Sequence, residues 1–160
     1  DPQYLSWKMK QLDYDARFIS LAEEINKSMP SFLVQKLEKA LVANGKTLSN
    51  STVIILGVTY KPNIADIRDS PALDIIRLLI KEGAEVIYND PYVQKLQLDE
   101  PYQLQSLALT SGNLANVDVA VIVSDHSSYD FEYISTCVGL MVDSRNATEG
   151  LNPSCQVVKI

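Results

Sequence analysis

The sequence predicts an α/β domain, built on a mostly parallel sheet with helices on both faces and preceded by a long helix. Beyond about residue 50, short apolar runs alternate with amphipathic segments, an order typical of parallel strands joined by helices. Before residue 50, apolar residues recur at helical spacing over a long stretch of the chain. An apolar content of 46% allows a substantial core.

Two helices are predicted in the first part of the chain. Residues 3–12 carry apolar side chains at helical spacing. A second apolar stripe keeps its phase through Pro30, which predicts one helix from about Ala16 to Asn44. We expect this helix to bend at Pro30 rather than end there, because proline removes one backbone hydrogen bond. Gly45 is a typical helix stop.

The length of the second helix suggests a role beyond core packing. Globular helices average about 11–12 residues, and longer ones with an apolar stripe often bridge domains or pack against a second copy. We therefore favour a homodimer or interdomain contact through this helix over ordinary burial. The predicted division is a helical segment, 1–46, followed by an α/β domain, 47–160.

The elements of the α/β domain follow from its apolar runs and turn residues. We expect strands at Val53–Leu56, Glu85–Tyr88, Val119–Val123, Gly139–Val142 and Gln156–Ile160, with a weaker candidate at Leu107–Leu109. We expect helices at Pro71–Lys81 and Tyr129–Thr136, with shorter ones near Val93–Leu98 and Asn113–Asn116.

Composition excludes several classes of partner. A net charge of −6 argues against a nucleic-acid partner. No apolar run approaches the roughly 20 residues of a membrane helix. Cys137 and Cys155 lack a metal-binding spacing, which favours a reducing, cytoplasmic setting. The chain begins at Asp1 rather than Met, so we interpret it as a fragment of a longer polypeptide.

The segment from Thr52 to Pro71 is the centre of the predicted site. A buried strand is followed by a loop that carries Lys61 and Arg68, and Ser70 then caps a helix that Pro71 opens. Loops at the carboxyl ends of strands bind ligands in open α/β sheets. Two cations near a helix N-terminus favour a phosphate or carboxylate ligand.

Polar residues also follow the other predicted strands. Asn89 and Asp90 follow the second strand, His126 the third, and Arg145 the fourth. Because the carboxyl ends of parallel strands share one edge, Lys61, Arg68 and Arg145 are expected to converge there. The sequence thus predicts a site for a phosphorylated or carboxylated small molecule in an acidic protein.

The sequence lacks several common catalytic and cofactor-binding motifs. No G-x-G-x-x-G follows the first strand, so a standard dinucleotide-binding half is not predicted, and no zinc spacing occurs. His126, the single histidine, is either an acid–base group or a residue that hydrogen-bonds backbone, and we favour the latter. We interpret Cys137 and Cys155 as structural, and find no nucleophile–base pair.

Several motifs together resemble the C-terminal domain of the UDP-glucose/GDP-mannose dehydrogenase family. They are GVTYKP (57–62), DIRDSPA (66–72), YNDPY (88–92) and DSRN (143–146), and the opening DPQYLSWK (1–8) resembles the segment after the family's catalytic cysteine. The opening is typical of the branch that acts on UDP-N-acetylhexosamines. The resemblance extends over essentially the whole chain and implies a Rossmann-like sheet and a long helix at a dimer core.

The resemblance also implies a reaction. The family oxidises the C6 alcohol of a nucleotide sugar to a carboxylate with two NAD molecules, through a cysteine-bound thiohemiacetal and thioester. The UDP-sugar lies between an N-terminal Rossmann domain and a domain like this one. The cysteine and the Rossmann domain are expected upstream of Asp1, so this fragment alone is expected to be inactive.

The resemblance assigns roles to five residues. Lys61 and Tyr60 are expected to line the sugar site, and Arg145 to face the nucleotide sugar. Arg68 is expected to reach NAD on the opposite domain. Asp1 matches a catalytic aspartate that assists the hydrolytic water.

The sequence departs from the family pattern at two positions. Ala65 stands where the family often has a second acid, and Asp69 where it often has Glu.

Two alternative functions remain open for this sequence. The first alternative is a stand-alone nucleotide-sugar-binding or regulatory module without catalysis. The second is a receiver- or flavodoxin-like domain that uses Asp90 or Asp125, which fold analogy alone supports weakly.

Overall fold

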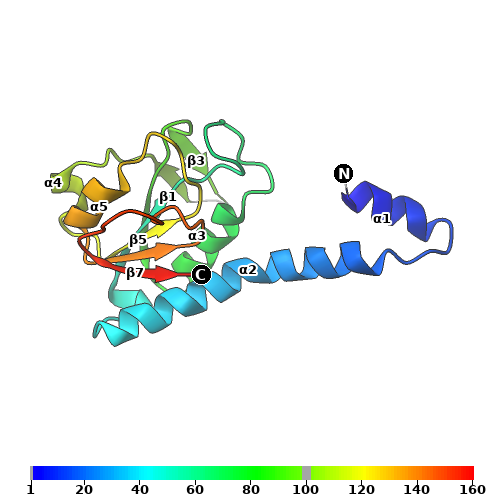
Figure 1. Ribbon diagram of the computed structural model, residues 1–160, viewed down its shortest axis with the longest axis horizontal. Helices are drawn as coiled ribbons and strands as arrows, with labels where there is room; N and C mark the ends of the chain where they lie inside the picture. The colour runs from blue at the N-terminus through cyan, green and yellow to red at the C-terminus, as the bar shows by residue number, and fades with distance from the viewer. Residues whose placement is uncertain (1, 99–101) are drawn as a thin grey trace.

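A parallel sheet of five strands in the order β2-β1-β5-β6-β7 forms the centre of the α/β domain (Figure 1). The computed structural model describes residues 2–98 and 102–160 of the chain, with side chains from residue 4 onward. The parallel pairing confirms the predicted fold class. The strands are β1 (Thr52–Leu56), β2 (Glu85–Asn89), β5 (Val119–Ile122), β6 (Leu140–Asp143) and β7 (Gln156–Lys159).

Two apolar layers cover the sheet because successive side chains of a strand point to opposite faces. Val53 and Ile55 of β1 join a core with α3 (Pro71–Lys81) and the second half of α2 (Arg17–Ala43). Ile54 and Leu56 join another core on the other face, with α4 (Ser111–Leu114) and α5 (Phe131–Cys137). Helices therefore lie on both faces, as the sequence predicts.

Helix α3 begins where its capping residues require. The Ser70 side chain accepts a hydrogen bond from the backbone N–H of Ala72, and Pro71 occupies the first turn without loss of a hydrogen bond. This start anchors the far end of the loop that follows β1. The loop is therefore held at both ends by regular structure.

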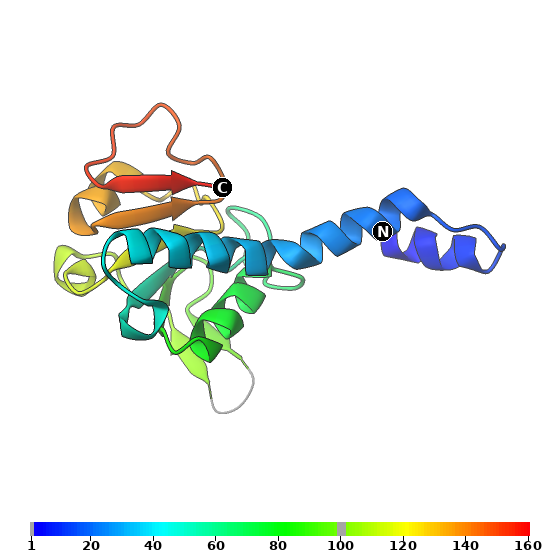
Figure 2. The ribbon, with the colours of Figure 1, turned by 90° about the horizontal axis from the view of Figure 1, so that it is seen from below.

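Helix α2 (Arg17–Ala43) runs through Pro30 as one element, as predicted. Its second half is buried against the α/β domain, whereas its first half exposes large apolar side chains, with Phe18 90% exposed. Figures 1 and 2 both show this first half, together with α1 (Pro2–Lys10), projecting away from the sheet. Residues 2–98 and 102–160 include no helix long and apolar enough to cross a membrane.

The region between β2 and β5 differs from the prediction. The helix expected near Val93–Leu98 is wrong: this segment forms β3 (Lys95–Gln97), paired antiparallel with β4 (Gln103–Gln105). Leu96 is fully buried between exposed neighbours, so a strand's alternation was present but too short to distinguish from a helix.

The weaker strand candidate at Leu107–Leu109 is also wrong, because this segment is irregular. Its backbone is held instead by single hydrogen bonds: the Leu107 N–H donates to Tyr88 O at 2.8 Å, and the Asn89 side chain donates to Leu107 O at 2.7 Å. The predicted start of α5 is two residues early, since the Asp130 side chain caps the helix by accepting from Tyr133 N–H.

Candidate functional site

The loops after β1, β2, β5 and β6 leave the sheet at one edge, because these strands are parallel and adjacent. Lys61 and Arg68 lie in the loop after β1, and Arg145 in the loop after β6. In Figure 1 this carboxyl edge faces the side toward which the first half of α2 projects. The predicted edge is therefore correct; a shared ligand for the three cations stays a prediction.

Hydrogen bonds hold both the backbone and the side chain of Arg145 in place. Its Nε–H donates to the carbonyl of Val123 at 2.6 Å, which orients the guanidinium. Among the described residues, its two terminal nitrogens have no hydrogen-bond partner, and the residue is exposed. One side of the guanidinium is thus anchored while the other is available to an anion.

The buried carboxylate of Asp143 shapes the turn that carries Arg145. Its oxygens accept the backbone N–H groups of Arg145 (2.9 Å), Ala147 (3.1 Å) and Thr148 (2.8 Å), and the Thr148 hydroxyl (2.7 Å). Burial raises the pKa of Asp143, but these hydrogen bonds outweigh burial and hold the pKa below its usual value. Asp143 belongs to the motif DSRN (143–146), but no local sequence pattern indicates this supporting role.

Arg68 forms a bidentate ion pair with Asp66 on the same loop. Nε donates to Oδ1 at 2.9 Å and Nη2 to Oδ2 at 2.7 Å, while the Arg68 side chain remains 85% exposed. The side-chain hydrogen bonds of Arg68, together with its backbone N–H, lower the pKa of Asp66 to about 2. A pair this exposed is weak, so it can open to admit another anion.

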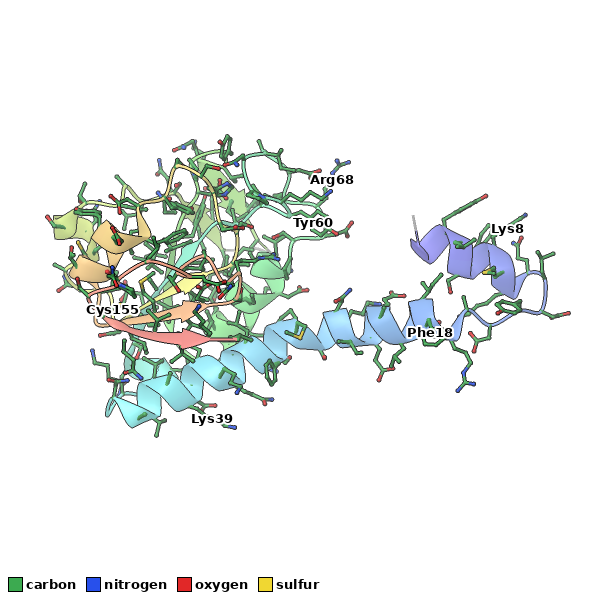
Figure 3. All side chains as sticks on the ribbon, in the orientation of Figure 1. Lys8, Phe18, Lys39, Tyr60, Arg68 and Cys155 are labelled. Carbon is green, nitrogen blue, oxygen red and sulfur yellow. The ribbon has the colours of Figure 1, made fainter. Side chains whose placement is uncertain are left out.

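Tyr60 and Lys61 form the turn nearest the strand. Lys61 Nζ lies 5.9 Å from the centre of the Tyr60 ring, and both side chains are exposed. Lys61 makes no ion pair within residues 2–98 and 102–160. Figure 3 shows Tyr60 and Arg68 on the same side of the α/β domain, so this loop presents both side chains there.

A buried polar network lies under this turn. His126 Nδ1 accepts the backbone N–H of Asn63 at 2.9 Å, and His126 Nε2 lies 3.0 Å from Asp90 Oδ2. This confirms the interpretation of His126 as a backbone-bonding residue. The partnership with Asp90, which follows a different strand, was missed because only the tertiary structure brings the two together.

Two tyrosines enclose the same network. Tyr92 and Tyr129 contact the His126 ring, with ring centres 5.0 and 5.4 Å away. Burial, followed by the nearby Asp90 charge, raises the pKa of the Tyr129 hydroxyl, which donates to Asn89 O at 2.9 Å. Tyr129 therefore remains a neutral donor at any physiological pH.

Gly57 lets two loops approach closely at the end of β1. Its φ is +80°, and a Cβ at this position would lie 2.5 Å from the backbone oxygen of Ser124. The Ser124 hydroxyl donates to Thr59 O at 2.5 Å, which fastens the loop after β5 to the loop after β1. The lone glycine therefore serves close packing, and no dinucleotide motif surrounds it.

The remaining predicted site residues fall into two groups. Asp1 lies outside the described residues, so its role stays a prediction. Cys137 and Cys155 are free thiols packed against the second core, and burial raises the pKa of Cys155, as suits structural residues. The described part of the chain contains no group of three or more acidic, His or Cys side chains able to hold a metal.

The chain is similar to known proteins over most of its length. Residues 54–150 match the model of the UDP-glucose/GDP-mannose dehydrogenase family, UDP binding domain. A UDP-N-acetyl-D-mannosamine dehydrogenase from Methanocaldococcus jannaschii is 38% identical over 130 residues, which cover 81% of this chain and 26% of that protein. An enzyme of the same name from Escherichia coli K12 is 31% identical over 134 residues, covering 81% and 31%.

Solved structures extend the likeness beyond the matched residues. A UDP-D-ManNAc dehydrogenase from Pyrococcus horikoshii has a TM-score of 0.79 at 25% identity and covers 95% of this chain and 35% of its own. A UDP-N-acetyl-mannosamine dehydrogenase from Staphylococcus aureus has a TM-score of 0.72 at 28% identity, covering 99% and 36%. The chain thus spans roughly a quarter to a third of its curated relatives' length. The chain belongs to the UDP-glucose/GDP-mannose dehydrogenase family and carries its UDP binding domain.

Proposed function

We propose that this chain forms the nucleotide-sugar side of the active site of an NAD-dependent 6-dehydrogenase. The enzyme oxidises the C6 alcohol of a UDP-sugar, a UDP-N-acetylhexosamine, to a uronate. The observation that carries the proposal is the single sheet edge where Lys61 Nζ and the terminal nitrogens of Arg145 are exposed and, among the described residues, form no ion pair. The family match and the names of the relatives support the substrate class.

Arg145 and Lys61 suit the two anionic parts of the reaction. The anchored guanidinium of Arg145 offers its terminal nitrogens to the diphosphate. Lys61, with Tyr60 beside it, lies near the sugar, where a single mobile cation offsets the developing carboxylate. Both interactions strengthen when ligand binding removes the site from water.

NAD is held mainly by residues outside this chain. The first strand is followed by a lone Gly57, so the described residues fit one contact to the cofactor rather than a complete dinucleotide site. Arg68 is that contact: its exposed pair with Asp66 opens and the guanidinium binds a cofactor phosphate. NAD, when bound, accepts the hydride from C6.

The other reacting groups belong to a partner domain. The relatives' additional length accommodates an N-terminal Rossmann domain with the catalytic cysteine. Asp1 assists the water that hydrolyses the cysteine-bound intermediate, as a nearby carboxylate can orient or deprotonate it. On this proposal the fragment alone is inactive because the nucleophile and most of the NAD site are missing.

The projecting helix provides the dimer contact. The first half of α2 exposes apolar side chains along one stripe, and α1 adds Tyr4, Leu5 and Trp7. An apolar surface of this kind is costly in water and marks an interaction site. Segment 1–46 is accordingly the end of a central dimerisation region, and 47–160 is the binding domain. The free cysteines suit a cytoplasmic enzyme.

The experiment is a turnover assay of the protein encoded by the full gene. A panel of UDP-hexoses and UDP-N-acetylhexosamines is incubated with NAD, and both NADH and uronate are quantified. We expect two NADH for each uronate, since oxidation of an alcohol to a carboxylate removes four electrons. UDP-sugar binding without NAD reduction would instead establish the binding-module alternative.

A further inference from the structure

His126 lies beneath the turn that carries Tyr60 and Lys61 without reaching the surface. The residue is 1% exposed, and its ring nitrogens contact loops that follow two other strands. Since Nδ1 accepts the Asn63 N–H, the single ring hydrogen of the neutral imidazole lies on Nε2. Nε2–H therefore donates to Asp90 Oδ2, 3.0 Å away.

Asp90 is a fixed anchor for this donor. Its Oδ2 also accepts the backbone N–H of Val58 at 2.7 Å, and its Oδ1 accepts the N–H groups of Tyr92 and Val93 at 2.8 and 3.2 Å. The carboxylate is fully buried and bound from both sides. It consequently fixes the imidazole plane and its tautomer, as a carboxylate does for an orienting histidine.

The turn is attached on either side of Lys61. Before it, Thr59 Oγ1 donates to Lys61 O at 2.9 Å and lies 3.3 Å from His126 Nε2. After it, Asn63, with a φ of +62°, donates its N–H to the imidazole and exchanges side-chain hydrogen bonds with Ser127. The histidine thus bonds the end of the turn at Asn63 and lies against the other end at Thr59.

The alternative acid–base role does not fit these contacts. Both ring nitrogens already have partners, and Tyr92 and Tyr129 cover the ring. Among the described residues, no buried side-chain nitrogen or oxygen lacks a hydrogen-bond partner. The network is complete without a ligand, which indicates a preformed support rather than a reacting group.

We propose that His126 is a positioning residue for the nucleotide-sugar site: its Nδ1 holds the Asn63 N–H and so sets the place of Lys61 at the sheet edge. The inference rests on the proposed function, because it assumes that Lys61 contacts the UDP-sugar. Asp90 supports the same turn by fixing the tautomer of His126. Neither residue touches the ligand.

Two variants separate the two nitrogens. His126→Asn retains an acceptor near the Nδ1 position and removes the Nε2 donor, whereas His126→Gln retains a donor near Nε2 and removes the Nδ1 acceptor. Both lose the ring contacts with Tyr92 and Tyr129, so their folding stabilities fall together. We expect amide hydrogen exchange at Asn63 to rise about tenfold in His126→Gln and to change little in His126→Asn.

The affinity for a UDP-sugar follows the same order. By calorimetry with UDP-N-acetylmannosamine, we expect the Kd to rise about tenfold in His126→Gln and to remain near the wild-type value in His126→Asn. In the intact enzyme, His126→Gln raises KM for the UDP-sugar more than it lowers kcat. Tyr129→Phe is the matched control, since it removes a hydroxyl from the same region without touching Asn63.

The single histidine makes the wild-type chain itself informative, because its ring nitrogens give an unambiguous pair of 15N signals. Hydrogen on Nε2 supports the proposal, and hydrogen on Nδ1 overturns it. Equal Asn63 exchange in His126→Gln, His126→Asn and Tyr129→Phe also overturns it. If Lys61→Ala leaves the Kd unchanged while His126→Gln still frees Asn63, then the assigned role of Lys61 fails and the turn-holding geometry remains established.

Discussion

The Nε–H of Arg145 donates a 2.6 Å hydrogen bond to the carbonyl of Val123, which joins the loop after β6 to the end of β5. This contact occupies Nε of the guanidinium. The bond to the Val123 backbone thereby fixes the direction in which the two terminal nitrogens point. An arginine held in this way loses little conformational entropy on binding an anion. The relationship explains how an exposed cation of an acidic chain is held in one orientation.

Replacing Arg145 tests its place in the site. Arg145→Ala is expected to weaken UDP-sugar binding by about 2–5 kcal/mol, because the buried diphosphate loses its paired charge. The change is measured as Kd by calorimetry and as KM in the intact enzyme. Lys39→Ala is the control, since Lys39 is an exposed lysine on α2, on the opposite side of Figure 3 from Arg68. An unchanged KM removes Arg145 from the site.

Arg68 is predicted to act on the cofactor. Arg68→Ala is expected to raise KM for NAD several-fold and to leave KM for the UDP-sugar unchanged, because its guanidinium is proposed to bind a cofactor phosphate rather than the sugar nucleotide. Steady-state kinetics with each substrate varied in turn provide the measurement. Asp66→Asn, which weakens the competing ion pair, is expected to lower KM for NAD. An effect on the sugar alone would reassign the residue.

Gly57 is expected to be intolerant of a side chain. Gly57→Ala combines a positive φ with a Cβ 2.5 Å from the Ser124 oxygen, so we expect a loss of about 2–4 kcal/mol in the free energy of unfolding. Urea denaturation measures it. Gly150→Ala is the matched control: its φ is +76°, but nothing lies within 4 Å of the added Cβ. Its expected cost is about 1 kcal/mol. Equal losses would show that the contact with Ser124 is unimportant.

Asp143 is expected to make the fold sensitive to acid. Its pKa in the folded chain lies below that of the unfolded chain, so its contribution to stability is complete above the unfolded value of about 3.9 and is lost as the pH falls toward the folded pKa. Asp143→Asn removes the charge, so the variant is less stable at pH 7 and loses less stability between pH 5 and pH 3. Urea unfolding across that range tests this, and parallel curves would contradict it.

The exposed half of α2 is expected to mediate self-association. Phe18→Glu and Ile25→Glu place charges on the apolar stripe and are expected to shift the chain from dimer toward monomer in light scattering after gel filtration. Val42→Glu is the control, because Val42 is exposed on the part of α2 that packs against the α/β domain. A monomeric wild-type chain, or no shift in either variant, would exclude this surface.

The sequence by itself determined the parallel α/β fold, the long helix through Pro30 and the family. These features depend on local periodicity, capping residues such as Ser70, and long contiguous motifs, all of which are visible along the chain. The sequence also predicted the sheet edge that carries Lys61 and Arg145, because parallel strands place their carboxyl ends at the same edge. The sequence did not predict the β3–β4 hairpin, since strands of three residues are too short for their alternation of apolar and polar residues to be recognised.

Only the tertiary structure decided how the site is supported. His126 and Asp90 lie 36 positions apart, and their hydrogen bond exists because β2, β1 and β5 are neighbours in the sheet. The anchoring of Arg145 on Val123 and the contact between Gly57 and Ser124 have the same origin. Burial and pairing depend on which strands become neighbours, and residue types alone do not specify that order.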